Sequence, residues 1–470
     1  METIKARINK DWPFIMASAI AFIYLVFSIS IPFFSDMSYI SSVAHNIYET
    51  NLHNLIDFKN DNGTPPLYSL YFSIIWKLFG YKLWVSHLAV FPFFIGFIYQ
   101  FYRFSQKYLT TKATFIALLF IIIDPTFMTQ FILMGYDIIL VFLFFLSINA
   151  ISKNNYKLLI MSTIIIPLIN IRGFSIVISI FFIQLFFLKN GNLKSIVATL
   201  KYYIPAIIVT ITWFTFHYFQ TSWIVVSNQN TSLHHISSLT WIFKNFIFEI
   251  IAFNSNGRLV IIAGLLLFYF FKNKNKRVIN RIPRELIILI MLSLAPFIII
   301  FTPLHYPVGP RYFMIAYPFI YLSFVYNIQK IKIKYQKLII TLSVSIIVLS
   351  NFWVNPYPYS NSWDSSLKSI SYLKIQKQML VDFKDVKLSG ESIIVDFPLH
   401  KNMKYNYLDN NYNFQFSIKS IEQAPKGSYI IYSNVYNNLE LRNEKPSIDN
   451  LNLYKEYHCY PAWIKVYRKE

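Results

Sequence analysis

The sequence predicts a polytopic α-helical membrane protein with about 11–13 transmembrane helices, interfacial helices in its first outer loop and a small C-terminal soluble α/β domain. Three observations predict this fold class. Of the 470 residues, 55% are hydrophobic and only 14% are charged. The apolar residues gather in runs long enough, or nearly long enough, to cross a bilayer. After residue 354 these runs stop, and the composition becomes that of a soluble domain.

The charge pattern excludes nucleic acid as the partner. The formal net charge is +21, but nucleic-acid binding requires basic residues clustered on one folded face. Here they sit in short loops between apolar runs, which is typical of membrane topology. The single cysteine, Cys459, excludes internal disulfides. The N-terminal METIKARINK and the roughly 22 mostly apolar residues after it are too long for a signal peptide and lack a small-residue cleavage site, so we interpret them as an uncleaved anchor.

The apolar runs set the predicted helices in order. Spans are predicted at 12–34, 83–101, 113–130, 136–151, 157–171, 173–188, 202–219, 258–271, 285–301, 311–327 and 336–354. Several are shorter than the usual ~20 residues, so a re-entrant arrangement of some pairs stays open. The segment PPLYSLYFSIIWKLFG at 65–80 begins with two prolines and contains Lys77. We expect it to be a helix in the outer interface, within a first outer loop at 35–82, and not a span.

Basic residues predict the orientation. With these spans, the loops on one side receive 21 Lys and Arg residues before the tail and the loops on the other side receive 7. The rich side is cytoplasmic by the positive-inside rule. We therefore expect an integral protein of a bacterial cytoplasmic (inner) membrane with a cytoplasmic N-terminus. A membrane domain at 1–354 is followed by a periplasmic or extracellular domain at 355–470, where 15 basic and 12 acidic residues nearly balance. The runs SIIVDF, GSYIIYS and WIKVYRK predict strands in this domain.

Acidic residues are scarce before the tail, and most fall at outer helix ends. Asp36 comes two residues after the first apolar run. It suits a first-turn acid favoured by the helix dipole and equally a general base at the membrane surface. His45, Glu49, His53 and Asp57 follow at steps of four. On one continuous helix they would form its wet face, and His45 with Glu49 would have the spacing of a metal site.

Two further regions supply candidate site residues. Asp137 begins a predicted span after the break at Asp124 and Pro125, where it either caps the helix or lines a site. Arg172 and Arg311 are two of the few basic residues expected on the outer face. Each suits contact with lipid headgroups or a phosphate clamp, because a planar guanidinium matches phosphate oxygens. We also expect substrate contacts from Glu49 and from three residues near Arg311, namely His305, Tyr306 and Tyr312.

The order of these patterns resembles a known superfamily. The series is the first span ending in Asp36, GTPPLYSLYFSIIWKLFG, DPTFMTQFILMGYD, NIRGF and GPRYFMIAYPFIYL before a C-terminal outer domain. It is similar to the GT-C superfamily of polyprenyl-phosphate-sugar-dependent membrane glycosyltransferases, which contains protein O-mannosyltransferases and lipid A aminoarabinose transferases. The resemblance implies catalytic roles for Asp36 and Asp137 and phosphate contacts for Arg172 and Arg311. Many relatives carry Asp-Glu where this chain has Asp36 and Met37, so a second carboxylate would have to come from Glu49 or Asp137.

The predicted function follows from the resemblance and the outer-face charges together. We expect an inverting glycosyltransferase that moves a sugar from a polyprenyl phosphate such as undecaprenyl phosphate to a cell-surface glycan or lipid, such as O-antigen of lipopolysaccharide or lipid A. The sequence does not require a metal, although a divalent metal is compatible with the chemistry. Two alternatives stay open: a transporter or flippase of a lipid-linked glycan, and a glycan polymerase or ligase. A transporter would place polar groups or broken helices at mid-depth, with a repeat in the hydropathy.

Overall fold

The computed structural model describes most of the chain. The described residues are 2–57, 61, 63–188, 193–224, 238–271, 283–304, 308–330, 333–355, 362–385, 393–395, 398–399, 402–414, 425–435 and 451–470. Up to residue 349 they form the helices α1 (Glu2–Ser28), α2 (Asp36–Glu49), α3 (Leu67–Phe79), α4 (Leu83–Ser105), α5 (Thr111–Ile123), α6 (Pro125–Ile132), α7 (Asp137–Ser152), α8 (Tyr156–Ile169), α9 (Gly173–Leu188), α10 (Leu193–Leu200), α11 (Ile204–Thr221), α12 (Leu239–Asn254), α13 (Arg258–Phe271), α14 (Arg284–Phe301), α15 (Tyr317–Ile328) and α16 (Ile333–Leu349).

The predicted spans follow the order of the helices, and each of them overlaps at least one helix. Within the described residues, four segments are long and apolar enough to cross a membrane alone: those in α1, α4, α14 and α16. The number rises to seven if each bent pair is one span, namely α5 with α6, α10 with α11 and α12 with α13. The helices α3, α7, α8 and α9 are shorter but apolar. The predicted polytopic helical fold is therefore confirmed, while the number of spans stays a prediction.

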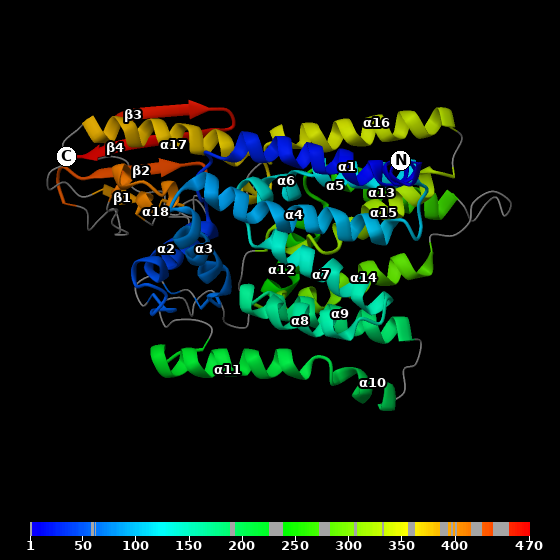
Figure 1. Ribbon diagram of the computed structural model, residues 1–470. Coiled ribbons are helices and arrows are strands. Elements are labelled where there is room, and N and C mark those ends of the chain that lie inside the picture. Colours follow the sequence, from blue (N-terminus) through cyan, green and yellow to red (C-terminus); the bar gives the residue numbers. More distant parts are fainter. Residues whose placement is uncertain are drawn as a thin grey trace.

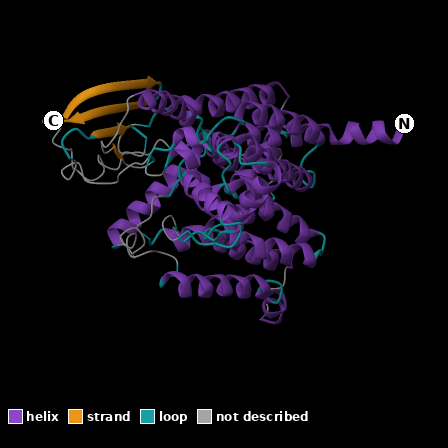
Figure 2. Cartoon of the chain, turned by 60° about the vertical axis from the view of Figure 1, so that its left-hand side comes forward, coloured by secondary structure: helices purple, strands orange, loops and turns teal. Residues whose placement is uncertain are grey.

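The two ends of the helical bundle differ. Figure 1 shows the long helices side by side, with α2, α3 and the β-sheet at one end and the N-terminus towards the other. Figure 2 shows the same separation from a second direction. We call the end that carries α2, α3 and the sheet the domain end. Helix α11 packs on α8 at the edge of the bundle (Figure 1).

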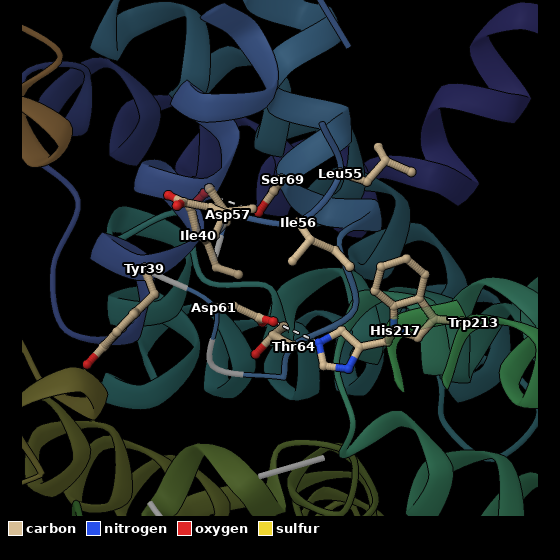
Figure 3. A pocket seen from close by; sticks show the side chains of 11 residues that line it. Tyr39, Ile40, Leu55, Ile56, Asp57, Asp61, Thr64, Ser69, Trp213 and His217 are labelled. Atoms are coloured by element: carbon tan, nitrogen blue, oxygen red, sulfur yellow. Dashed lines mark hydrogen bonds and ion pairs between the residues drawn. The ribbon is translucent and has the colours of Figure 1, made fainter. Parts of the chain in front are cut away.

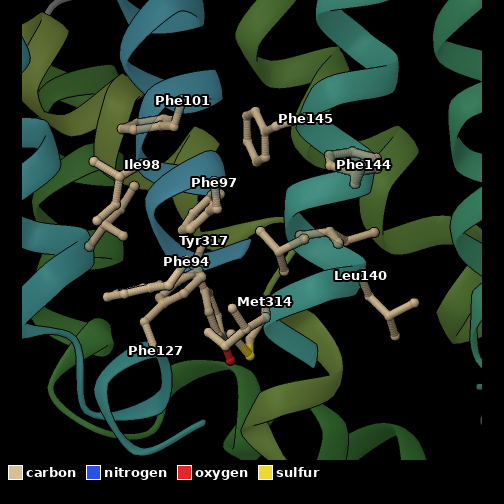
Figure 4. Close-up of a cluster of buried hydrophobic side chains, with 14 of the residues drawn as sticks. Phe94, Phe97, Ile98, Phe101, Phe127, Leu140, Phe144, Phe145, Met314 and Tyr317 are labelled. Atoms are coloured by element: carbon tan, nitrogen blue, oxygen red, sulfur yellow. The ribbon is translucent and has the colours of Figure 1, made fainter. Parts of the chain in front are cut away.

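Aromatic side chains fill the centre of the bundle between α4, α6, α7 and α15 (Figure 4). Phe94 stacks on Phe131 with ring centroids 4.4 Å apart, and Phe97 stacks on Phe127 at 5.3 Å. A Cβ at Gly96 would lie 2.6 Å from the ring of Phe142, so glycine lets α4 and α7 approach closely. In lipid the hydrophobic effect does not favour one apolar contact over another. Dense packing of this kind therefore stabilises the bundle through dispersion.

The C-terminal residues form a second core beside a mixed sheet. Its strands are β1 (Ile393–Val395), β2 (Tyr429–Ser433), β3 (Leu451–Cys459) and β4 (Ala462–Lys469), in the order β1-β2-β4-β3. β1 and β2 are parallel, and the other two pairings are antiparallel. Helix α17 (Lys368–Asp385) packs against β3 and β4. The three predicted strand segments are confirmed as β1, β2 and β4, whereas β3 was not predicted.

One feature of the first outer loop differs from the expectation. Helix α2 ends at Glu49, and the next residues turn away, with positive φ angles at Asn51 and Leu52. His53 therefore does not continue the helical stripe. His45 is half-buried between the rings of Tyr81 and Tyr405, at 5.2 and 5.1 Å, so it does not belong to a wet face. The helix expected at 65–80 is present as α3, which packs on α2, and its place at the membrane interface stays a prediction.

Candidate active site

Arg311 lies at the centre of a buried charge cluster at the domain end. It belongs to a short 3-10 turn, η3 (Pro310–Phe313), and is 6% exposed. Its guanidinium forms an ion pair with Asp36, the first residue of α2. Its Nε lies 3.0 Å from Asp364 of the C-terminal region and 4.0 Å from Asp137, the first residue of α7. Arg311 thus joins three segments that are far apart in the sequence.

The contact with Asp364 is an ion pair without an aligned hydrogen bond. The Nε of Arg311 is buried, and no acceptor among the described residues meets the geometry for a hydrogen bond with it. A buried donor of this kind is costly unless another group satisfies it. The contact between Nε and Asp364 is therefore mainly electrostatic.

Arg172 is the second buried cation of the cluster. Its Nη1 lies 3.2 Å from Asp137, and its Nη2 donates a 2.5 Å hydrogen bond to the hydroxyl of Tyr136. The guanidinium carbon lies 4.0 Å from the ring centroid of Tyr312, a cation–π contact. Tyr312 also lies 5.4 Å from the guanidinium of Arg311, so both cations flank its ring.

Local backbone geometry holds Arg172 in place. Asn170 accepts hydrogen bonds from the backbone N–H and the Nε of Arg172, at 2.9 and 3.3 Å. The next residue, Gly173, begins α9 against the end of α8. A Cβ there would lie 2.4 Å from the carbonyl oxygen of Ile166. Glycine is therefore required for this close approach.

A small pocket opens beside the two arginines. Its polar lining comes from Asp137, Arg172, Arg311, Tyr312 and Ser175. The remaining lining residues are apolar: Leu140, Val141, Ile176, Phe297, Met314 and Ile315. The lining thus carries two cations and one carboxylate next to an apolar surface. We call it the arginine pocket.

Asp36 is the accessible acid beside this pocket. Its side chain is 32% exposed, whereas that of Asp137 is 6% exposed. Tyr136 donates to Asp36 at 3.5 Å and also accepts from Arg172, so it links the two ion pairs. One turn further along α2, burial and, second, the charge of Asp36 raise the pKa of Tyr39 to about 12. Tyr39 therefore stays protonated at neutral pH.

A second buried ion pair, between Arg258 and Asp124, lies next to the segment that carries Asp364. Arg258 is 1% exposed and meets Asp124 through two hydrogen bonds, of 2.8 Å from Nε and 2.7 Å from Nη2. Asp124 also caps α6 by accepting from the backbone N–H groups of residues 126 and 127. From α6, Gln130 donates a 2.7 Å hydrogen bond to the carbonyl oxygen of Asp364. We call the Arg258–Asp124 pair the brace. Through α6 it connects the break before that helix with Asp364, which contacts Arg311.

The structure brings together five of the predicted site residues: Asp36, Asp137, Arg172, Arg311 and Tyr312. Glu49 is exposed at the other end of α2, about 20 Å from Asp36 along the helix axis, and does not join them. His305 and Tyr306 lie outside the described residues. Among the residues that the structure describes, no three His, Cys, Asp or Glu gather as metal ligands.

Sequence reasoning missed Tyr136 and Asp364. Tyr136 is next to Asp137, but one tyrosine among 34 gives no signal. Asp364 lies in the polar tail, where it is one of 12 acids. Like Asp36, it contacts Arg311. Asp364 and Asp137 are thus two further carboxylates of the cluster. Many members of the superfamily that the sequence resembles have a second acid at the position of Met37.

Comparison with solved structures identifies the fold. Crystal structures of ArnT from Cupriavidus metallidurans, one bound to undecaprenyl phosphate and one in the apo state, align with 96% of this chain and 97% of their own. The TM-score is 0.55 for each, at 10% sequence identity. The chain has the fold of ArnT. The polytopic helical fold with a small C-terminal domain, expected from the sequence, is thereby confirmed.

The likeness to ArnT extends over both parts of the chain. An alignment covering 96% of the residues includes the helical bundle and the C-terminal sheet. At 10% identity it is a likeness of fold. The sequence matches no protein-family model and no curated protein at a significant level.

Proposed function

We propose that this protein is an inverting glycosyltransferase that transfers a sugar from a polyprenyl phosphate carrier to a cell-surface glycan or lipid. Lipopolysaccharide O-antigen and lipid A are the acceptor classes that we favour. The reaction would take place at the domain end, on the outer side of a bacterial inner membrane. The fold shared with ArnT, one of whose structures contains undecaprenyl phosphate, supports this class of donor.

The lining of the arginine pocket is the observation that carries the proposal. Two guanidinium groups and one carboxylate give that side of the cluster a net positive charge beside six apolar side chains. A phosphate attached to a long hydrocarbon chain has the same two-part character. Guanidinium groups suit it because they bind phosphate oxygens through paired N–H donors. The pocket therefore fits the leaving group of the proposed reaction.

The chemistry assigns a role to each charged residue. The acceptor hydroxyl attacks the anomeric carbon, the new C–O bond forms, and the C–O bond to the phosphate breaks with inversion. Asp36 accepts the hydroxyl proton, since it is the most exposed carboxylate beside Arg311. Arg172 and Arg311 stabilise the charge of the departing polyprenyl phosphate. Asp137 and Asp364 hold these guanidinium groups in position.

Replacing Asp36 by Asn tests the base. Purified protein in nanodiscs would receive a polyprenyl phosphate sugar and a lipopolysaccharide acceptor, with the product measured by mass spectrometry. Loss of a general base lowers rates by roughly 10²–10⁴-fold. We expect a loss of this size in Asp36→Asn, with undecaprenyl phosphate binding retained.

Asp382→Asn is the matched control. Asp382 is an exposed acid on α17 that pairs with Lys455 at the surface, far in sequence from the cluster. An exposed ion pair contributes little to stability, so this variant should keep full activity. Full activity in Asp36→Asn would remove Asp36 from the mechanism. Binding of the carrier without any transfer by the native protein would favour a transporter.

A further inference from the structure

A second pocket lies between the first outer loop and the end of α11. We call it the α11 pocket and define it by Asp57, Asp61, Thr64, Ser69, Trp213 and His217. Figure 3 shows these side chains around it, with Asp61 and His217 facing each other. It shares no lining residue with the arginine pocket. It thus offers a separate binding surface.

The two pockets differ in charge. The lining of the α11 pocket contains two carboxylates and neither lysine nor arginine. His217, 2% exposed, lies 2.7 Å from Asp61 and ties the loop to α11. A phosphate would meet mainly negative charge here. The pocket therefore suits a ligand that is not anionic and that donates hydrogen bonds to carboxylates.

The indole N–H of Trp213 adds a second requirement. Its Nε1 is buried and has no hydrogen-bond acceptor among the described residues. Such a donor is costly when left unsatisfied, and a metal ion cannot satisfy it, because the group needs an acceptor. Since Trp213 lines the pocket, a bound ligand is placed to provide one. The ligand must therefore both donate and accept hydrogen bonds, as hydroxyl groups do.

The size and position of the α11 pocket limit which ligands it can bind. The pocket encloses about 330 Å³ counted out to its open mouth. Much of this space lies in the open mouth, so the pocket can contact one face of a single sugar unit and cannot enclose a chain. Tyr39 also lines the pocket and sits one helical turn from Asp36, a spacing of about 5–6 Å.

We infer that the α11 pocket binds a neutral or amino sugar unit of the acceptor, next to the base Asp36. Its assignment to the acceptor rests on the proposed glycosyl transfer. The donor phosphate and the acceptor sugar would then bind in separate pockets, with Tyr39 of one and Arg311 of the other each close to Asp36. Helix α11, which supplies Trp213 and His217, also carries exposed apolar residues, among them Ile208, Ile211 and Phe219. A sugar that belongs to a membrane lipid would therefore reach the pocket along α11.

Saturation-transfer NMR on the full chain in nanodiscs tests this site. The probes are methyl glycosides of glucose, galactose, mannose, rhamnose, glucosamine and N-acetylglucosamine. We expect at least one to bind, with its ring C–H groups closest to the protein. Trp213→Phe keeps an aromatic ring but removes the N–H, and should weaken this binding about 3- to 10-fold, as expected for one lost hydrogen bond. Trp213→Ala should abolish it. Trp353→Phe, at a tryptophan that is 68% exposed, is the matched control and should not change it.

Undecaprenyl phosphate binding, measured on the same samples, separates the two proposals. Retained binding in the Trp213 variants shows that the fold and the arginine pocket are intact. If no glycoside binds, or if both Trp213 variants bind glycosides as the native protein does, the inference is overturned. If glycosides bind through Trp213 but undecaprenyl phosphate does not bind the native protein, the sugar site is supported and its assignment to an acceptor is overturned.

Discussion

At the scale of single residues, Arg311 determines how the cluster is assembled. It is buried and meets carboxylates from α2, α7 and the C-terminal region. A buried charge without partners is strongly destabilising, so each carboxylate contributes to its placement. The same contacts orient its guanidinium towards the pocket. Stability and the proposed phosphate binding therefore depend on one side chain.

Arg172 allows a test in which the charge is conserved. Lys at this position keeps the positive charge but loses the planar group that meets Asp137, Tyr136 and Tyr312. Removal of one preorganised donor to a transition-state charge typically costs roughly 10²–10³-fold in rate. We expect Arg172→Lys to lower the transfer rate by this amount, measured as kcat with saturating donor.

Arg103→Lys provides the comparison for that measurement. Arg103 is exposed in the last turn of α4, away from the domain end. Its replacement should leave the rate unchanged. Equal rates in Arg172→Lys and in the native protein would contradict a role for the guanidinium of Arg172.

Scarcity of charge is the reason that part of the site could be predicted. Asp36, Asp137, Arg172 and Arg311 stand out because the membrane segments contain so few ionisable residues, and such residues are costly there. Asp364 could not be predicted on this basis, because charge is ordinary in the soluble tail. Its role depends on a tertiary contact with Arg311 that no local pattern encodes.

At the scale of secondary-structure elements, breaks between helices place the charged groups. The axes of α5 and α6 differ by 59°, and those of α12 and α13 by 92°. Asp124 lies at the first break and Arg258 begins the helix after the second. Their ion pair joins the two breaks. Asn256, two residues before Arg258, connects this region to the C-terminal domain by donating a 2.9 Å hydrogen bond to the carbonyl oxygen of Ser365.

A double-mutant cycle tests this brace. Arg258→Met alone leaves a buried carboxylate without its cation, and loss of one partner of a buried pair costs roughly 3–5 kcal/mol. Asp124→Asn keeps an N-cap for α6 and removes the charge. We expect the single Arg258→Met variant to unfold at a clearly lower temperature in detergent, and the double variant to recover part of the loss. Additive effects of the two substitutions would show that the pair does not couple the breaks.

Helix boundaries show what local patterns can and cannot predict. Pro125 marks the break between α5 and α6, because proline cannot continue an incoming helix. The end of α2 carries no such signal, since Asn51 and Leu52 adopt positive φ angles without a glycine. Helix α12 was also not predicted, because its apolar residues were assigned to an outer loop. Only its packing near α13 and η3 reveals its place.

At the scale of the whole molecule, the order of apolar runs predicted the fold although the identity to ArnT is only 10%. Both the runs and the basic loops are set by the membrane, so they persist when individual residues change. The position of the C-terminal domain at the end that carries α2 and α3 agrees with the predicted order of crossings (Figure 1). Which side of the membrane this end faces stays a prediction.

Cys459 provides a direct test of that side, because it is the only cysteine of the chain and is partly accessible at the end of β3. We expect a membrane-impermeant maleimide to label it in spheroplasts with intact inner membranes. The combined variant Cys459→Ser with Lys112→Cys moves the thiol to the start of α5, where Lys112 is exposed. This variant should be labelled only after the membrane is opened. The reverse labelling pattern would show that the domain end faces the cytoplasm.

The central claim is that the arginine pocket binds the phosphate of a polyprenyl carrier. A cryo-EM structure of the full chain in nanodiscs with undecaprenyl phosphate measures this most directly. The account predicts phosphate density within hydrogen-bonding distance, about 2.7–3.2 Å, of the guanidinium groups of Arg172 and Arg311, with the isoprenoid chain along the apolar lining. Phosphate density elsewhere, with both arginines still paired only to their carboxylates, would contradict it.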